Sequence, residues 1–122
     1  MEQEILFRGL DLTGNWIYGG HAKDSEGSYI LVERKNCLFW VVPVKPETVG
    51  IFSTTLDKNK TKMFHGDIFK LGTEKGFFEV RFIHGCSLVY KNGKQYGILT
   101  ELKECFLEVV GNTTDNPEML HD

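Results

Sequence analysis

The sequence predicts an all-β protein, and three observations support this prediction. Apolar and polar residues alternate with a period of two in short stretches, best at Phe77 to Ile83, where Phe78, Val80 and Phe82 share one face. No long stretch keeps the 3.6-residue period of an amphipathic helix. Thirteen glycines against three prolines in 122 residues suit frequent tight turns between strands. We therefore expect about nine short antiparallel strands with only fragments of helix.

The expected strands are rich in β-branched and aromatic residues and are bounded by turn formers. In chain order they cover residues 4–8, 15–22, 29–32, 38–44, 68–71, 77–83, 88–91, 94–96 and 106–110. Gly19-Gly20 indicates a bend or bulge in the second of them. The fourth is expected to be buried, and Trp16 and Trp40 are expected in the core. Residues 54–62 are interpreted as a polar turn.

Helical signals are limited to two short places. Pro46 can open one helical turn that extends to Val49, and Asp115-Asn116-Pro117-Glu118 can cap a short terminal helix. The strongest turn signal is Asn92-Gly93, which lies between two apolar stretches and supplies the two positive φ angles of a type I′ turn. We therefore expect a two-residue β-hairpin at Asn92-Gly93.

Polarity rises along residues 57–65, just before Gly66-Asp67 opens a new strand. This change predicts two adjoining small β units within one domain that covers residues 1–122. The N-terminal unit is expected at residues 1–62, the C-terminal unit at residues 63–112 and a tail at residues 113–122. A chain of this length is enough for one core or two small adjoining cores.

The composition is that of an ordinary folded domain. Apolar residues make up 41% and charged residues 25% of the chain, which excludes a disordered segment. The net charge of −3 leaves no basic field to draw the molecule onto nucleic acid or an anionic membrane. No apolar run approaches the roughly 18 residues of a membrane span, and no secretory leader opens the chain. We expect a cytoplasmic protein with no membrane partner.

Metal and redox chemistry find no support in the spacing of cysteines and histidines. Cys37, Cys86 and Cys105 are isolated and form no C-x-x-C pair, so reduced thiols are the simple interpretation. The histidines are widely spread and show no ligand spacing: His21, His65, His84 and His121. We expect no metal and no cofactor.

His65-Gly66-Asp67 places a base and a carboxylate close together in the sequence. A catalytic pair needs converging side chains, whereas neighbours on a strand point to opposite faces. Our interpretation is a turn glycine before a strand, with Asp67 bonding its own backbone. The chain also lacks a G-x-S-x-G elbow and a phosphate-binding glycine loop, so no catalytic residue is predicted.

Lys58, Lys60 and Lys62 alternate and would share one face of an extended segment. Such a row of cations can contact phosphates, and small β-barrels that bind oligonucleotides offer an analogy at the level of the fold. The other interpretation is a solvated loop with solubilising lysines, which Asp57 and the acidic net charge support. The three lysines are the binding residues of a nucleic-acid hypothesis.

Eight short motifs, each present once, follow one another along nearly the whole chain. The motifs are I-L-F-R-G-L-D (5–11), G-N-W-I-Y-G (14–19), S-Y-I (28–30), P-E-T-V-G (46–50), D-K-N (57–59), G-D-I (66–68), V-V-G-N (109–112) and N-P-E-M-L (116–120). In this order they resemble the YopX family of small proteins encoded by bacteriophages and prophages. The chain departs from the family at Thr55 and at Lys60, where the family has glycine, which leaves the turn geometry there open.

The resemblance implies a predominantly β fold with a small barrel-like, SH3-like unit in the C-terminal half, a phage or prophage origin, and a bacterial cytoplasm. It brings no catalytic residue, because the family has no established chemistry. We therefore expect a non-enzymatic protein-binding or adaptor module whose partner is an unknown host or phage protein. Self-association is open as well, because short β units leave edges that need cover.

Two other functional classes stay open beside the adaptor interpretation. The first is a nucleic-acid-binding small β-barrel that uses Lys58 to Lys62. The second is an enzyme whose site assembles only in three dimensions. Salt-sensitive binding of oligonucleotides would favour the first, and a polar pocket with converging titratable groups would favour the second.

Overall fold

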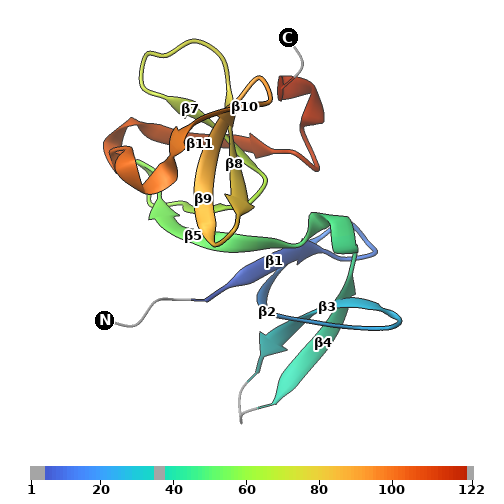
Figure 1. The fold of residues 1–122 in the computed structure, drawn as a ribbon. Coiled ribbons are helices and arrows are strands. Elements are labelled where there is room, and N and C mark those ends of the chain that lie inside the picture. Colours follow the sequence, from blue (N-terminus) through green and yellow to red (C-terminus); the bar gives the residue numbers. More distant parts are fainter. Residues whose placement is uncertain (1–4, 35–37, 121–122) are drawn as a thin grey trace. The chain divides into compact units, whose positions relative to one another are not determined.

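The computed structural model describes residues 5–34 and 38–120, and within them the fold is almost entirely β (Figure 1). Short 3₁₀ turns interrupt the strands, and these ranges contain no α-helix. The strands are β1 (Phe7–Leu10), β2 (Trp16–Asp24), β3 (Gly27–Glu33), β4 (Phe39–Val44), β5 (Gly50–Leu56), β6 (Lys62–Phe64), β7 (Asp67–Leu71), β8 (Phe78–Ile83), β9 (Cys86–Lys91), β10 (Lys94–Ile98) and β11 (Leu107–Asn112). The all-β prediction is confirmed.

Four 3₁₀ turns carry the helical content of these ranges. They are η2 (Pro46–Thr48), η3 (Leu99–Glu101), η4 (Glu104–Phe106) and η5 (Pro117–Leu120). The two that begin at Pro46 and Pro117 match the helical starts expected from the sequence, because proline at the first position already has the required φ angle. The other two follow β10 and lead the chain back to β11.

The chain forms two compact units, one up to Phe52 and one from Ser53 onward. The division falls inside β5, whereas the sequence placed its boundary after residue 62. The segment expected as a tail belongs to the second unit, where the backbone N–H of Thr113 donates to the carbonyl of Gly66 at 2.8 Å.

In the first unit the strands pair antiparallel in the order β4-β3-β2-β1-β5, and β6 continues this order in the second unit. β2 changes partner at its two glycines: residues up to Gly19 pair with β1, and residues from Gly20 pair with β3. A Cβ on Gly19 would lie 2.1 Å from the carbonyl oxygen of Leu31, so glycine is needed for this close approach. A small buried core is formed by Leu10, Ile30, Val44 and Phe52.

In the second unit the strands pair antiparallel in the order β10-β9-β8-β7-β11. The core consists of Met63, Phe69, Leu71, Phe78, Val80, Val89, Leu99 and Leu107. The β9–β10 hairpin has the expected two-residue turn, with Lys91 opposite Lys94. Asn92 and Gly93 have φ angles of 53° and 78°, as a type I′ turn requires.

Two strands were not predicted, β5 and β6. The stretch interpreted as a polar turn contains the last residues of β5 and the first residue of β6. Ser53 and Thr55 of β5 are buried, and the backbone N–H of Thr55 donates to Ser53 Oγ at 3.1 Å. Because buried polar side chains break the alternation of apolar and polar residues, the strand gives no period-two signal.

Candidate functional site

The D-K-N motif is a tight turn organised by the carboxylate of Asp57. Asp57 is 1% exposed, and its Oδ1 accepts from the backbone N–H groups of Asn59 at 2.8 Å and Thr61 at 2.9 Å. Its Oδ2 accepts from the N–H of Val109 in β11 at 3.0 Å. Both oxygens of this carboxylate accept hydrogen bonds from backbone N–H groups. The carboxylate therefore stabilises the turn and holds it to β11 in the second unit.

The three lysines of the nucleic-acid hypothesis follow Asp57 but do not lie in one extended segment. Lys60 has a φ of 66° in the turn, and only Lys62 belongs to a strand. All three side chains are exposed. Lys58 Nζ lies 3.7 Å from Glu108 Oε1. The shared face assumed from the alternation therefore does not form.

His65-Gly66-Asp67 forms a turn before β7, as interpreted from the sequence. Gly66 has a φ of 94°, and Asp67 Oδ2 accepts from the N–H of Phe64 at 2.7 Å. His65 Nδ1 accepts from the N–H of Phe82 at 2.9 Å. The side chains of His65 and Asp67 thus bond to the backbone of different strands.

The remaining described histidines and cysteines form no metal-binding group. Among the described residues no group of three His, Cys, Asp or Glu side chains could hold a metal ion. Cys86 and Cys105 are exposed; Cys105 lies in η4 and not in a strand. His21 Nε2 is buried without a hydrogen-bond partner, and its ring centroid is 5.4 Å from that of Phe7. Cys37 and His121 lie outside the described residues.

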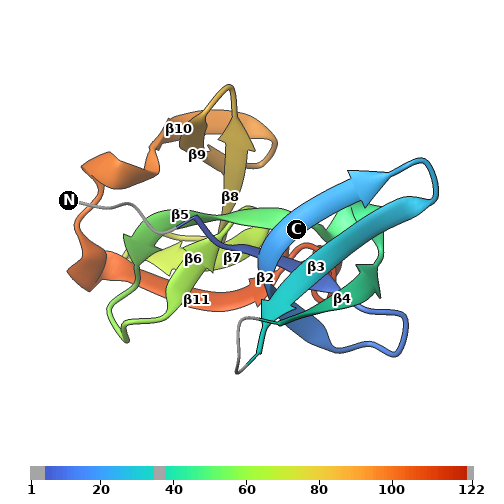
Figure 2. The ribbon, with the colours of Figure 1, turned by 90° about the horizontal axis from the view of Figure 1, so that it is seen from below.

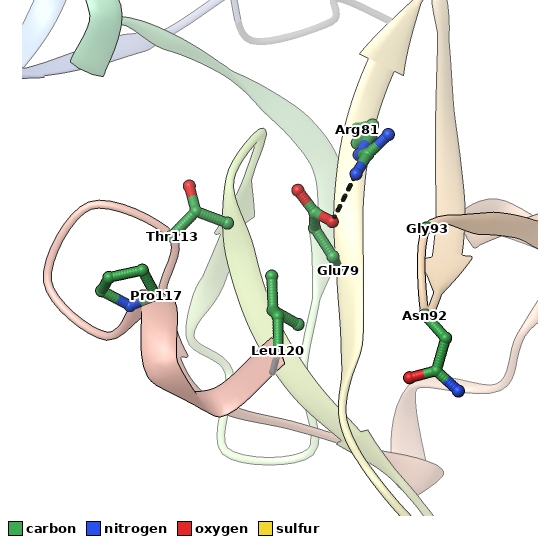
Figure 3. Close-up of a pocket in the computed structure, with 7 residues that line it drawn as sticks. All are labelled: Glu79, Arg81, Asn92, Gly93, Thr113, Pro117 and Leu120. Carbon is green, nitrogen blue, oxygen red and sulfur yellow. Dashed lines mark hydrogen bonds and ion pairs between the residues drawn. The ribbon is translucent and has the colours of Figure 1, made fainter. Parts of the chain in front are cut away.

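A cleft of about 920 Å³ opens in the second unit beside β8 (Figure 3). It is bounded by β8, by the β9–β10 turn and by the segment that contains η5. The residues that line it are Glu79, Arg81, Asn92, Gly93, Thr113, Pro117 and Leu120. None of the residues singled out in the sequence as a candidate for chemistry lies in this lining.

The two charged side chains of this cleft form an ion pair with each other. Arg81 Nη2 donates to Glu79 Oε1 at 3.0 Å, and the guanidinium carbon lies 4.2 Å from the ring centroid of Tyr90. Figure 3 shows both side chains on β8, joined by this bond. The described lining contributes no histidine or cysteine. The described lining therefore offers one ion pair and no other titratable group that could act as a general base.

The first unit exposes a continuous apolar stretch at its edge. Leu38, Phe39, Trp40 and Val41 are 64%, 59%, 54% and 60% exposed. The predictions that this strand is buried and that Trp40 is a core residue are therefore wrong. Successive side chains of a strand point to opposite faces, so exposure of all four means that the described residues cover neither face of β4 here. β4 ends the strand order, with β3 beside it (Figure 2). The other tryptophan, Trp16, is half-buried.

Among the described residues, the backbone of β4 is paired on one side only over residues 38–41. The N–H of Arg34 donates to the carbonyl of Leu38 at 2.7 Å, and Val32 lies opposite Trp40 in the register. Hydrogen-bonded and non-bonded pairs alternate in an antiparallel ladder, so the backbone groups of Phe39 and Val41 point away from β3. We call residues 38–41, with these outward-pointing groups, the β4 edge.

The sequence held one signal for this edge, which is Pro43. Proline has no N–H and occurs in sheets on edge strands or at bulges. In the register Pro43 lies opposite Tyr29, at a non-bonded position of the β3 ladder, so the ladder loses no donor. An interpretation of F-W-V-V-P-V that took account of Pro43 would have predicted an edge strand.

The sequence matches no protein-family model and no curated protein. The resemblance to the YopX family therefore stays a prediction. Within residues 5–34 and 38–120, no helix is long and apolar enough to cross a membrane.

Proposed function

We propose that the chain is a non-enzymatic protein-binding module that binds its partner through the β4 edge. The observation that supports this proposal is the run of four exposed apolar side chains, Leu38 to Val41, on a strand with outward-pointing backbone groups. Contiguous exposed apolar residues mark interaction sites in soluble proteins. A free strand edge adds main-chain hydrogen bonds, which give affinity when a partner strand is added to the sheet.

The proposal includes the source suggested by the motifs. The chain is a YopX-like protein of a phage or prophage, and it acts in the bacterial cytoplasm. This part is supported by the ordered motifs from Ile5 to Leu120 in the sequence.

The β4 edge offers more to a protein partner than the cleft beside β8 does. In the cleft, the charge of Arg81 is balanced by Glu79 at 3.0 Å, and a ligand would have to compete with that bond. At the β4 edge, binding removes apolar side chains from water and gives partners to backbone groups that face solvent.

The test is affinity capture with a tagged chain in a host that carries the phage or prophage. Val41→Glu places a charge on the β4 edge, and Leu12→Glu places the same charge on a residue of the same unit that is 71% exposed. A protein that is captured by the wild type and by Leu12→Glu, and lost with Val41→Glu, supports the proposal. Captured proteins that are identical for all three chains would place the binding surface elsewhere.

A further inference from the structure

The outward side of β4 has a restricted set of backbone donors and acceptors. Phe39 and Val41 each present one N–H and one carbonyl to solvent, because their positions in the β3 register are non-bonded. Pro43 has no N–H, and the bridge between Val44 and Asp11 lies next to it on this side of β4. An added strand can therefore both accept from an N–H group and donate to a carbonyl of β4 only at Phe39 and Val41.

Both ends of the open stretch are closed. At one end Val44 bridges Asp11, and the N–H of Lys45 donates to the carbonyl of Leu10 at 2.8 Å. At the other end the bond from Arg34 to Leu38 closes the β3–β4 turn. Within the described residues, an added strand can follow β4 from Leu38 to Pro43, and Asp11 beside Val44 stops it there.

We propose that the β4 edge pairs with the β4 edge of a second copy of this chain, antiparallel about a two-fold axis that passes beside Trp40. The inference rests on the proposed function of the β4 edge and names its partner. In this register Phe39 lies opposite the partner's Val41, and Val41 lies opposite the partner's Phe39. Each copy donates two N–H groups and accepts two, so every outward N–H between the closed ends is bonded.

The alternative registers are excluded by features already described. A shift that placed Val41 opposite the partner's Val41 would bring the partner's Leu38 opposite Val44, where Asp11 already lies. Among the described outward groups, the opposite shift would pair only Phe39 with the partner's Phe39, so it would form fewer bonds between residues 38 and 43. Intermediate shifts place outward groups opposite groups that face β3, and no ladder forms.

The side chains also fit a second copy. Residues 38 to 44 carry no charge, so the paired strands put no like charges directly opposite each other. The Arg34 guanidinium carbon lies 3.9 Å from the ring centroid of Trp40 and covers one face of that ring. Trp40 meets the partner's Trp40 at a non-bonded pair, the position where cross-strand side chains are closest. The edge is far smaller than the roughly 20–30 residues a side of a stable interface, so the dimer is reversible and depends on concentration.

Cysteine cross-linking tests the register. In a chain whose native cysteines are replaced by serine, Trp40→Cys places two thiols on the axis. Cβ atoms of directly opposed residues lie about 4.5–5.5 Å apart, close to disulfide geometry. Phe39→Cys and Val41→Cys are the matched controls, because the two copies of either residue lie diagonally, about 7–8 Å apart. We expect disulfide-linked dimers with Trp40→Cys and several-fold less with either control. Cross-linking that is strongest at residue 41 or 39 would overturn the register.

Sedimentation equilibrium tests the association itself. The mass of the wild-type chain should rise with concentration from 14.0 kDa toward twice that value. Val41→Pro removes an outward N–H but no bond to β3, so it should keep the wild-type circular dichroism spectrum and remain a monomer. A wild-type chain that stays monomeric at its solubility limit would overturn the inference. If the wild-type chain is monomeric but captures another protein, and Val41→Glu abolishes that capture, the proposed function still holds. If Val41→Glu does not affect the capture, the proposed function is contradicted as well.

Discussion

Asp57 Oδ2 accepts a hydrogen bond of 3.0 Å from the backbone N–H of Val109, 52 residues further along the chain. The other oxygen of the same carboxylate closes the turn through Asn59 and Thr61. The N–H of Lys58 donates to the carbonyl of Leu107 at 2.8 Å and adds a second link from this turn to β11. One buried side chain therefore fixes the D-K-N turn and the position of β11 beside it.

We expect Asp57→Asn to lower the free energy of unfolding by about 1–3 kcal/mol, the cost of leaving buried polar groups without partners. In asparagine one of the two carboxylate oxygens is replaced by an NH₂ group, which cannot accept a hydrogen bond. A backbone N–H that donates to that oxygen would then face another donor. Urea unfolding measures the effect. Asp24→Asn is the control, since Asp24 caps an exposed turn through Glu26 and Gly27. Equal losses for the two variants would contradict the structural role of Asp57.

The same carboxylate should make stability depend on pH. Burial raises the pKa of Asp57, but hydrogen bonds from Val109, Thr61 and Asn59 outweigh burial and hold the pKa below its ordinary value. The unfolded chain then binds more protons at acidic pH, so the stabilisation is complete above about pH 4 and is lost as the pH falls through the folded pKa. Between neutral and acidic pH, the wild type should lose more stability than Asp57→Asn. Parallel pH profiles would show that the carboxylate is not stabilised by these bonds.

A separate prediction concerns the β9–β10 hairpin. Gly93→Val should destabilise the fold by about 1 kcal/mol or more, because a β-branched residue resists the φ of 78° found there. Gly97→Val is the matched control, since Gly97 lies in β10 without a positive φ and a Cβ there meets no atom within 4 Å. Thermal melts compare the two variants. An unchanged midpoint for Gly93→Val would mean that the turn tolerates the strained conformation.

Sequence reasoning found those parts of the fold whose signals are local. The Asn92-Gly93 turn and the alternation of β8 depend on neighbouring residues. The turn is present, and buried Phe78 and Val80 alternate with half-buried Glu79 and Arg81, whereas Phe82 is exposed. The 3₁₀ turn at Pro46 follows from one residue with a fixed φ angle. Signals of this kind are contained in a few consecutive residues, so a single sequence is enough to read them.

The features that were missed depend on partners far along the chain. Asp57 seemed a loop residue because its partner Val109 is remote in sequence. The β4 stretch F-W-V-V has the composition of a core strand, but no described segment covers either face of it, and Trp40 is exposed. The cleft beside β8 gathers residues from three separate segments, so no motif marks it.

We expect Gly19→Ala to destabilise the first unit much more than Gly20→Ala does. A Cβ on Gly19 would lie 2.1 Å from the carbonyl oxygen of Leu31, whereas a Cβ on Gly20 would lie 3.9 Å from the nearest atom, Leu31 Cβ. Backbone cannot move aside as a side chain can, so we expect a loss of about 1–3 kcal/mol or more for Gly19→Ala. Denaturant midpoints of the two variants measure the difference. Similar midpoints would show that β2 and β3 can separate without cost.

The last prediction concerns the alternative function based on Lys58, Lys60 and Lys62. The turn at Asp57 does not place them on one extended face, and Lys58 has Glu108 as a neighbour at 3.7 Å. Three cations contribute a slope of at most about −3 in log K against log salt, so affinity for phosphates falls steeply with salt. We expect no gel shift of single- or double-stranded oligonucleotides at micromolar protein and about 150 mM salt. Triple alanine variants at residues 58, 60 and 62, and at the exposed control lysines 70, 75 and 94, should both behave like the wild type. A tight wild-type shift that only the first variant abolishes would replace the protein-binding proposal with nucleic-acid binding.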